Sequence, residues 1–132
     1  MTPARILIAD DDASIRRLLK MSLRYQNYAV VEARNGREAL TKMRGGNVDL
    51  VLLDLMMPEV SGWDVLRERT ADPSLQRIPI IVMTATNERA ATVGLLNAAV
   101  DAIVAKPFDL DALEASISAC LERVHPAAPA AA

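Results

Sequence analysis

Short apolar runs alternate with amphipathic stretches along the chain. The runs are rich in Val, Ile and Leu, which is typical of strands that are buried on both faces. They predict strands at residues 6–9, 29–33, 50–53, 78–83 and 102–105. Between and after these runs, apolar residues recur at helical spacing, which predicts helices at about 13–23, 38–44, 63–70, 87–99 and 110–124.

This alternation of strand and helix predicts the fold class. Nearly continuous apolar strands need a helix layer on each face, as in a parallel sheet. Right-handed crossovers between parallel strands then give an open, doubly wound α/β sheet. The Pro- and Ala-rich residues 125–132 are typical of a linker or a frayed end, so we expect one domain at 1–124.

Composition narrows the function classes. The 132 residues suit one domain, and 52% hydrophobic with 24% charged residues excludes general disorder. The net charge of −2 gives no sign of direct nucleic-acid binding. The single Cys120 and single His125 exclude an internal disulfide and a thiolate or histidine metal cluster. With no apolar run of roughly 18 residues and no signal sequence, we expect a cytoplasmic domain without a membrane partner.

Chemically useful side chains follow the strands. Asp10 and Asp11 come after the first strand, Asp54 after the third, Thr84 after the fourth and Lys106 after the fifth. The carboxyl ends of parallel strands meet at one edge, so these groups should gather there. Clustered carboxylates either raise one another's pKa or recruit a hard cation such as Mg²⁺. A cation, an amine and a hydroxyl together suit a phosphoryl group.

Taken one at a time, such polar residues after a strand are usually turn or capping residues without a function. Asp12, which follows Asp11, is expected to be only a helix cap. In combination the sequence resembles the receiver domain of two-component response regulators over residues 4–124. The resemblance is carried by Ile6-Leu7-Ile8-Ala9-Asp10-Asp11-Asp12, Val51-Leu52-Leu53-Asp54-Leu55-Met56-Met57-Pro58, Ser61-Gly62, Val82-Met83-Thr84-Ala85 and Ala105-Lys106-Pro107-Phe108. It implies a flavodoxin-like (βα)5 fold whose five parallel strands have the order 2-1-3-4-5.

The resemblance also implies a metal site. Asp11 and Asp54 would bind Mg²⁺ directly, together with the backbone carbonyl of Met56. Asp10 would hold the ion through water. Mn²⁺ would substitute for Mg²⁺.

The implied function is signalling, with catalysis limited to the domain's own phosphorylation and dephosphorylation. Asp54 would accept a phosphoryl group from a sensor histidine kinase or phosphotransfer protein, and Thr84 and Lys106 would bind its oxygens. Phosphorylation would then switch a surface formed by residues 87–99, 102–105 and 110–124. That surface would contact a downstream protein or a fused output domain, and a homodimer through it is a further hypothesis.

Two positions affect what the resemblance implies for switching and for dephosphorylation. Ile103 stands where the family often has a Tyr or Phe that turns inward on activation, so an aromatic switch cannot operate in its usual form. Met56, two residues after Asp54, has a side chain that cannot position an attacking water, which predicts slow self-dephosphorylation.

Two other functions compete with this one. The pattern Asp10-x-Asp12-x-Ser14 is similar to that of phosphohydrolases that use an aspartate nucleophile. In such an enzyme Asp10, and not Asp54, would carry the phosphoryl group. That family also needs a further acidic pair after the lysine, whereas Asp109 and Asp111 are expected to open a helix. The other alternative is a binding module of the same fold that no longer takes phosphate. The sequence is compatible with a stand-alone regulator and with a piece of a longer protein.

Overall fold

The computed structural model describes residues 3–85, 100–106 and 109–124. The helix expected at 87–99 and the tail at 125–132 lie outside these ranges. No helix within them is long and apolar enough to cross a bilayer. The described elements are β1 (Arg5–Ala9), α1 (Ala13–Tyr25), β2 (Ala29–Ala33), α2 (Gly36–Arg44), β3 (Leu50–Asp54), α3 (Gly62–Ala71), β4 (Ile80–Ala85), β5 (Ala102–Lys106) and α5 (Leu110–Val124).

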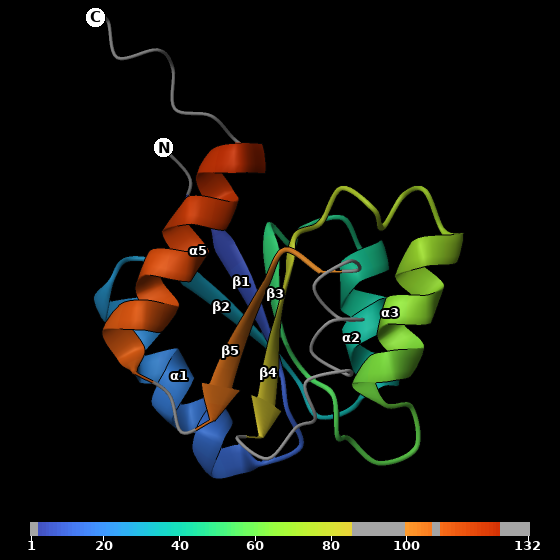
Figure 1. Ribbon diagram of the computed structural model, residues 1–132, viewed down its shortest axis with the longest axis horizontal. Coiled ribbons are helices and arrows are strands. Elements are labelled where there is room, and N and C mark those ends of the chain that lie inside the picture. The colour runs from blue at the N-terminus through green and yellow to red at the C-terminus, as the bar shows by residue number, and fades with distance from the viewer. Residues whose placement is uncertain (1–2, 86–99, 107–108, 125–132) are drawn as a thin grey trace, which may run out of the picture.

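The strands form one parallel sheet in the order β2-β1-β3-β4-β5. Helices α1 and α5 cover one face of this sheet, and α2 and α3 cover the other (Figure 1). The expected fold class, a flavodoxin-like doubly wound sheet in the order 2-1-3-4-5, is therefore confirmed.

Each central strand contributes to two cores. In β3, Leu50 and Leu52 pack into the cluster under α1 and α5, whereas Val51 and Leu53 pack into the cluster under α2 and α3. All four side chains are completely buried. Successive side chains of a strand point to opposite faces, so a strand between two helix layers must be apolar throughout. This requirement explains the uninterrupted apolar runs of the sequence.

Short polar side chains cap the N-termini of α1, α2 and α3. Asp12 caps α1, and its carboxylate accepts a hydrogen bond from the Ser14 N–H at 2.8 Å, as expected from the sequence. Asn35 caps α2, which therefore begins at Gly36, two residues before the expected start. Ser61 caps α3 with a reciprocal capping box.

Strand β4 differs from its expected range. We expected it to begin at Ile78, but the Ile78 N–H donates to the Leu75 carbonyl at 3.1 Å in a turn, and the strand begins at Ile80. Pro79 lies between them and has no N–H to donate to a neighbouring strand. At its other end the strand continues to Ala85, so Thr84 lies within the strand and not after it.

Candidate functional site

The residues predicted for the site come from four strands that end at the same edge of the sheet. Asp10 and Asp11 follow β1, Asp54 ends β3, Thr84 lies near the end of β4, and Lys106 ends β5. Parallel pairing of β1 with β3, of β3 with β4 and of β4 with β5 sets their order across the edge. The site therefore depends on the strand order and not on nearness in the chain.

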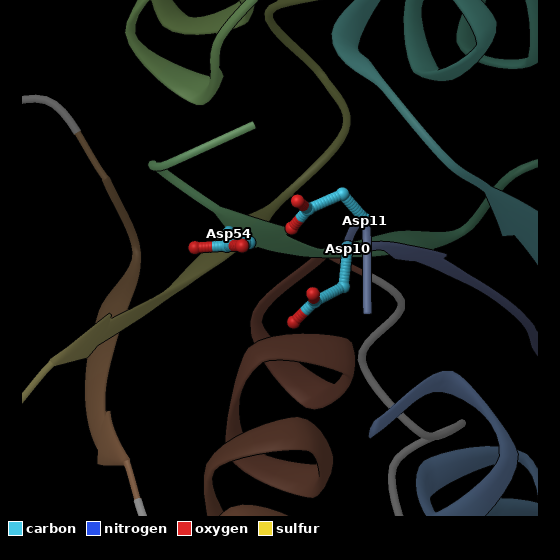
Figure 2. A group of neighbouring side chains, drawn as sticks. All are labelled: Asp10, Asp11 and Asp54. Atoms are coloured by element: carbon cyan, nitrogen blue, oxygen red, sulfur yellow. The ribbon is translucent and has the colours of Figure 1, made fainter. Parts of the chain in front are cut away.

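Three carboxylates converge at this edge. One oxygen from each of Asp10, Asp11 and Asp54 lies within 4.8 Å of the other two (Figure 2). Asp10 is completely buried, Asp54 is 7% exposed and Asp11 is exposed. Hard divalent cations prefer carboxylate oxygens, and a cation would relieve the repulsion among these acids. The cluster therefore fits a metal ion of the Mg²⁺ type.

Hydrogen bonds and ion pairs hold the buried carboxylates in place. The Lys106 ammonium donates to Asp10 Oδ2 at 2.9 Å and lies 3.6 Å from Asp54 Oδ2. The remaining oxygen of Asp10 accepts the Asp12 N–H at 2.9 Å, and Asp54 Oδ1 accepts the Met56 N–H at 3.1 Å. Lys106 thus links two acids from different strands and neutralises part of their charge.

The environment raises the pKa of Asp54 to about 6. Burial is the main cause, because a desolvated carboxylate is disfavoured relative to the neutral acid. The charges of Asp10 and Asp11 raise the pKa further, whereas the Met56 N–H and the Lys106 ammonium lower it. A bound cation would act in the same direction as Lys106.

Other residues from the sequence analysis are placed as follows. Thr84 is 5% exposed at the end of β4. Met56 is 70% exposed. Ile103 and Trp63 are partly buried against the cluster under α2 and α3, as expected for Trp63, and Cys120 fills the other core, also as expected.

Gly62 shows how closely α3 approaches the site. A Cβ at this position would collide with the main-chain oxygen of Asp54 and with Leu55. The Gly62 N–H donates to the Leu55 carbonyl at 3.0 Å. A glycine therefore allows the loop after Asp54 to return directly to the strand that it left.

Sequence reasoning missed Arg16 and Glu32. An Arg16 Nη1–H donates to the main-chain carbonyl of Asp10 at 2.7 Å, and the Arg16 Nε–H donates to Glu32 Oε1 at 3.3 Å. The available signal was Glu32 itself, a charged residue in the otherwise apolar stretch 29–33. Only the pairing of β1 with β2 places it beside α1.

Comparison with known proteins agrees with this geometry. The sequence model of the response regulator receiver domain matches residues 6–118, and the chain belongs to that family. It is 43% identical over 122 residues to the transcriptional regulatory protein ResD of Bacillus subtilis, covering 90% of this chain and 48% of ResD. It is 40% identical over 126 residues to the response regulator MprA of Mycolicibacterium vanbaalenii, covering 94% and 53%. The chain thus spans about half the length of these curated relatives.

Solved structures show the same fold. A signal receiver domain of a histidine kinase from Syntrophus aciditrophicus superposes with a TM-score of 0.85 at 28% identity, covering 96% of each chain. A CheY-like receiver domain protein from Methanospirillum hungatei superposes with a TM-score of 0.81 at 30% identity, covering 92% of this chain and 96% of that one. The chain is therefore a receiver domain, which is a signalling domain of two-component systems.

Proposed function

We propose that this receiver domain, spanning residues 1–124, accepts a phosphoryl group on Asp54 in a Mg²⁺-dependent reaction. The observation that carries the proposal is the convergence of Asp54 with two further carboxylates and the Lys106 ammonium. A nucleophile, acidic cation ligands and a fixed positive charge are the parts that phosphoryl transfer needs.

The transfer is a displacement at phosphorus. A carboxylate oxygen of Asp54 forms a bond to phosphorus while the phosphorus–nitrogen bond of a donor phosphohistidine breaks, and the imidazole leaves with a proton. Lys106 lies 3.6 Å from one Asp54 oxygen, so its ammonium stands next to the charge that arrives. The Thr84 hydroxyl, on the neighbouring strand, would donate to a phosphoryl oxygen.

The metal ligands follow from the same cluster. Asp11 and Asp54 would bind Mg²⁺ or Mn²⁺ directly with the carbonyl of Met56, and Asp10, which already pairs with Lys106, would act through water. Bound at these oxygens, the cation would screen the charge of the incoming phosphoryl group.

The output is a change of binding partner. A sensor histidine kinase or phosphotransfer protein would supply the phosphoryl group in the cytoplasm. A downstream protein or fused output domain would then bind the surface of residues 87–99, β5 and α5, through which a homodimer is the alternative assembly. The partly buried Ile103 would leave this switch without an aromatic rotamer change.

The burial and the contacts of Asp10 argue against the phosphohydrolase alternative. Asp10 is completely buried, with one carboxylate oxygen held by Lys106 and the other by the Asp12 N–H. Asp109 caps α5, where its carboxylate accepts the Asp111 N–H at 2.9 Å, so these acids begin a helix as expected. Asp54 is thus the better nucleophile.

The test is incubation with acetyl phosphate and Mg²⁺ followed by intact-mass and peptide mass spectrometry. We expect one added phosphoryl group on Asp54 and none on Asp54→Asn or with EDTA. Asp12→Asn is the matched control, because it removes a neighbouring charge and keeps a capping side chain, and it should be labelled normally. A label on Asp10 would favour the phosphohydrolase, and no label at all would favour the module that no longer takes phosphate.

A further inference from the structure

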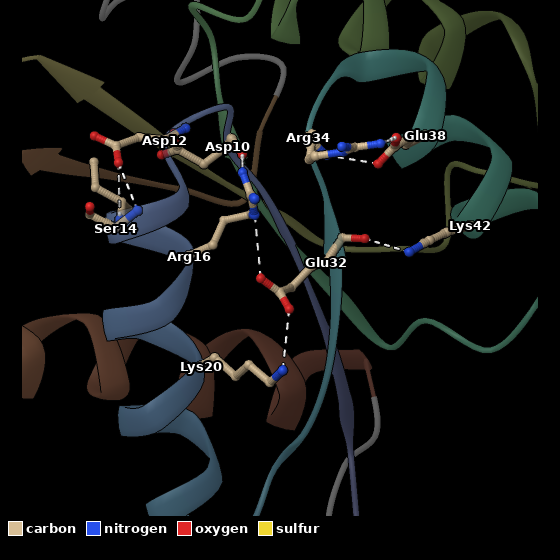
Figure 3. Close-up of polar contacts among 10 residues, drawn as sticks. Asp10, Asp12, Ser14, Arg16, Lys20, Glu32, Arg34, Glu38 and Lys42 are labelled. Atoms are coloured by element: carbon tan, nitrogen blue, oxygen red, sulfur yellow. Dashed lines mark hydrogen bonds and ion pairs between the residues drawn. The ribbon is translucent and has the colours of Figure 1, made fainter.

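The side chain of Arg16 joins the acidic site to strand β2. Arg16 lies just past the first turn of α1, and its side chain is 12% exposed. One nitrogen donates to the Asp10 carbonyl at 2.7 Å, and another donates to the Glu32 carboxylate at 3.3 Å (Figure 3). Among the described residues, the guanidinium therefore bonds to the main chain of a site residue and to Glu32, and not to the site carboxylates.

The Asp10 carbonyl lies where β1 leaves the sheet. The Asp10 N–H still donates to the Ala33 carbonyl at 3.1 Å, but the register of β1 with β2 ends at the pair Ala9 and Ala33. Within the part of the chain that the structure describes, the strand ladder offers the Asp10 carbonyl no partner beyond that pair. Since Asp10 is completely buried, its carbonyl needs a donor, and Arg16 supplies one.

This carbonyl belongs to the peptide between two acids of the site. A peptide unit is planar, so fixing the direction of its carbonyl restricts ψ of Asp10 and φ of Asp11. These two rotations set the relative directions of the Asp10 and Asp11 side chains. Arg16 thus acts on the spacing of carboxylates whose oxygens must lie together, within 4.8 Å, to share a cation.

Glu32 fixes the direction of the guanidinium in turn. Its Oε1 accepts from Arg16, and its Oε2 pairs with the Lys20 ammonium at 3.3 Å. An arginine suits this place because its planar fork donates in two directions at once, whereas a lysine has one ammonium. Lys20 pairs with Glu32 as Arg16 does but makes no hydrogen bond to Asp10 within the described part of the chain, so Lys20 is a matched control.

We propose that Arg16 is a positioning residue of the acidic site, oriented by Glu32, which holds the peptide between Asp10 and Asp11 in the direction that cation binding requires. The inference rests on the proposed Mg²⁺-dependent function and adds to it a residue away from the strand ends. Loss of a group that orients ligands typically weakens metal binding by about tenfold or more.

Mg²⁺ affinity measured by isothermal calorimetry tests the proposal. We expect Arg16→Met to weaken Mg²⁺ binding about tenfold. The Mg²⁺ affinities of Arg16→Lys and Glu32→Gln should lie between those of Arg16→Met and the wild type. The affinity of Lys20→Met should match that of the wild type. Ile117→Val, a core change in α5, controls for lower stability and should leave the affinity unchanged. If Arg16→Met does not fold, Arg16→Lys and Glu32→Gln decide. Wild-type affinity in Arg16→Met, or in both of those variants, overturns the inference and leaves the proposed function intact.

A second measurement needs no metal. The Asp12 N–H donates to the Asp10 carboxylate at 2.9 Å. Its rate of hydrogen exchange therefore reports how rigidly residues 10–12 are held. In the metal-free protein, exchange at Asp12 should be faster in Arg16→Met, or in Arg16→Lys, than in Lys20→Met. Equal protection in these variants overturns the inference. A wild type that binds no Mg²⁺ overturns the proposed metal-dependent function, and the exchange result then judges the role of Arg16 by itself.

Discussion

Asp54 is subject to two opposing requirements. A nucleophilic carboxylate must be ionised, but burial beside other acids raises the pKa of Asp54 to about 6. Its Oδ1 accepts the Met56 N–H and its Oδ2 lies near Lys106, and both contacts favour the charged form. At the scale of the residue, the ionisation of Asp54 therefore depends on burial, on Lys106 from β5 and on the Met56 N–H two residues along the chain.

This raised pKa has a consequence for the stability of the metal-free protein. Since the folded-state pKa lies above the ordinary value of 3.8, ionisation of Asp54 destabilises the fold, and its contribution to stability is lost as pH rises through about 4 to 6. We expect Asp54→Asn to gain stability relative to the wild type across this window, by about 1 kcal/mol after allowance for screening. Urea unfolding in EDTA below and above the window measures it. Asp12→Asn should show no such change, and a constant difference for Asp54→Asn would contradict the shift.

We expect Met56 to affect the rate at which the proposed phospho-Asp54 is hydrolysed. Met56 is 70% exposed, and its thioether offers no strong hydrogen-bond donor or acceptor to a water near Asp54. We expect Met56→Asn to release phosphate several-fold faster than the wild type, because an amide can orient the attacking water. The decay of radiolabelled phospho-Asp54 measures the rate, with Met56→Leu as the control that should match the wild type. Equal rates in all three proteins would show that position 56 does not limit hydrolysis.

At the scale of elements, Asp101 ties β4 to its surroundings. Its Oδ2 accepts the Ile80 N–H at 2.8 Å and the Arg69 guanidinium at 3.2 Å. The Arg69 Nε–H also donates to the Ile78 carbonyl at 3.2 Å. These contacts join α3 to the start of β4, the strand that carries Thr84 at its other end.

Removal of this carboxylate should therefore destabilise the sheet. We expect Asp101→Ala to lower the free energy of unfolding by about 2 kcal/mol, because the Ile80 N–H and the Arg69 guanidinium both lose an acceptor. Asp101→Asn keeps one carbonyl oxygen and should lose less. Glu122→Ala, at an exposed position of α5, is the control. Chemical denaturation measures all three, and a loss for Asp101→Ala no greater than that for Glu122→Ala would contradict the proposed contribution.

At the scale of the whole molecule, the acidic edge would couple the proposed metal binding to folding. The three carboxylates meet only when β1 and β3 are paired, so an unfolded chain offers no such site. A ligand that binds only the folded state stabilises it by mass action. Mg²⁺ should therefore stabilise the entire sheet and not merely one loop.

Thermal unfolding with and without Mg²⁺ tests this coupling. At Mg²⁺ tenfold above its dissociation constant, we expect a gain of about 1.4 kcal/mol. Asp11→Asn should remove most of the gain and still fold, because Asp11 is exposed. Mn²⁺ should stabilise in the same way. A gain that persists in Asp11→Asn would place the responsible cation elsewhere.

Much of the architecture was predictable from the chain, for a specific reason. Strands buried on both faces must be apolar at every position. The apolar residues 50–53 therefore predict such a strand from the local sequence alone. Capping is equally local, so Asp12 was predictable as the start of α1. The start of β4 was not predicted, because Ile78 continues the apolar pattern of the strand although its N–H donates to the Leu75 carbonyl in a turn.

From the sequence one could predict the type and order of the described elements, the residues at the strand ends and, through the motifs, the family. The sequence did not determine the distances among those residues, because Asp10 and Lys106 are separated by most of the chain and meet only through strand order. The tertiary structure alone decided that Lys106 joins two acids, that burial raises the pKa of Asp54, and that Arg16 holds the Asp10 carbonyl. Local patterns reflect interactions within a few residues, whereas charge, burial and spacing at a shared edge depend on every strand that reaches it.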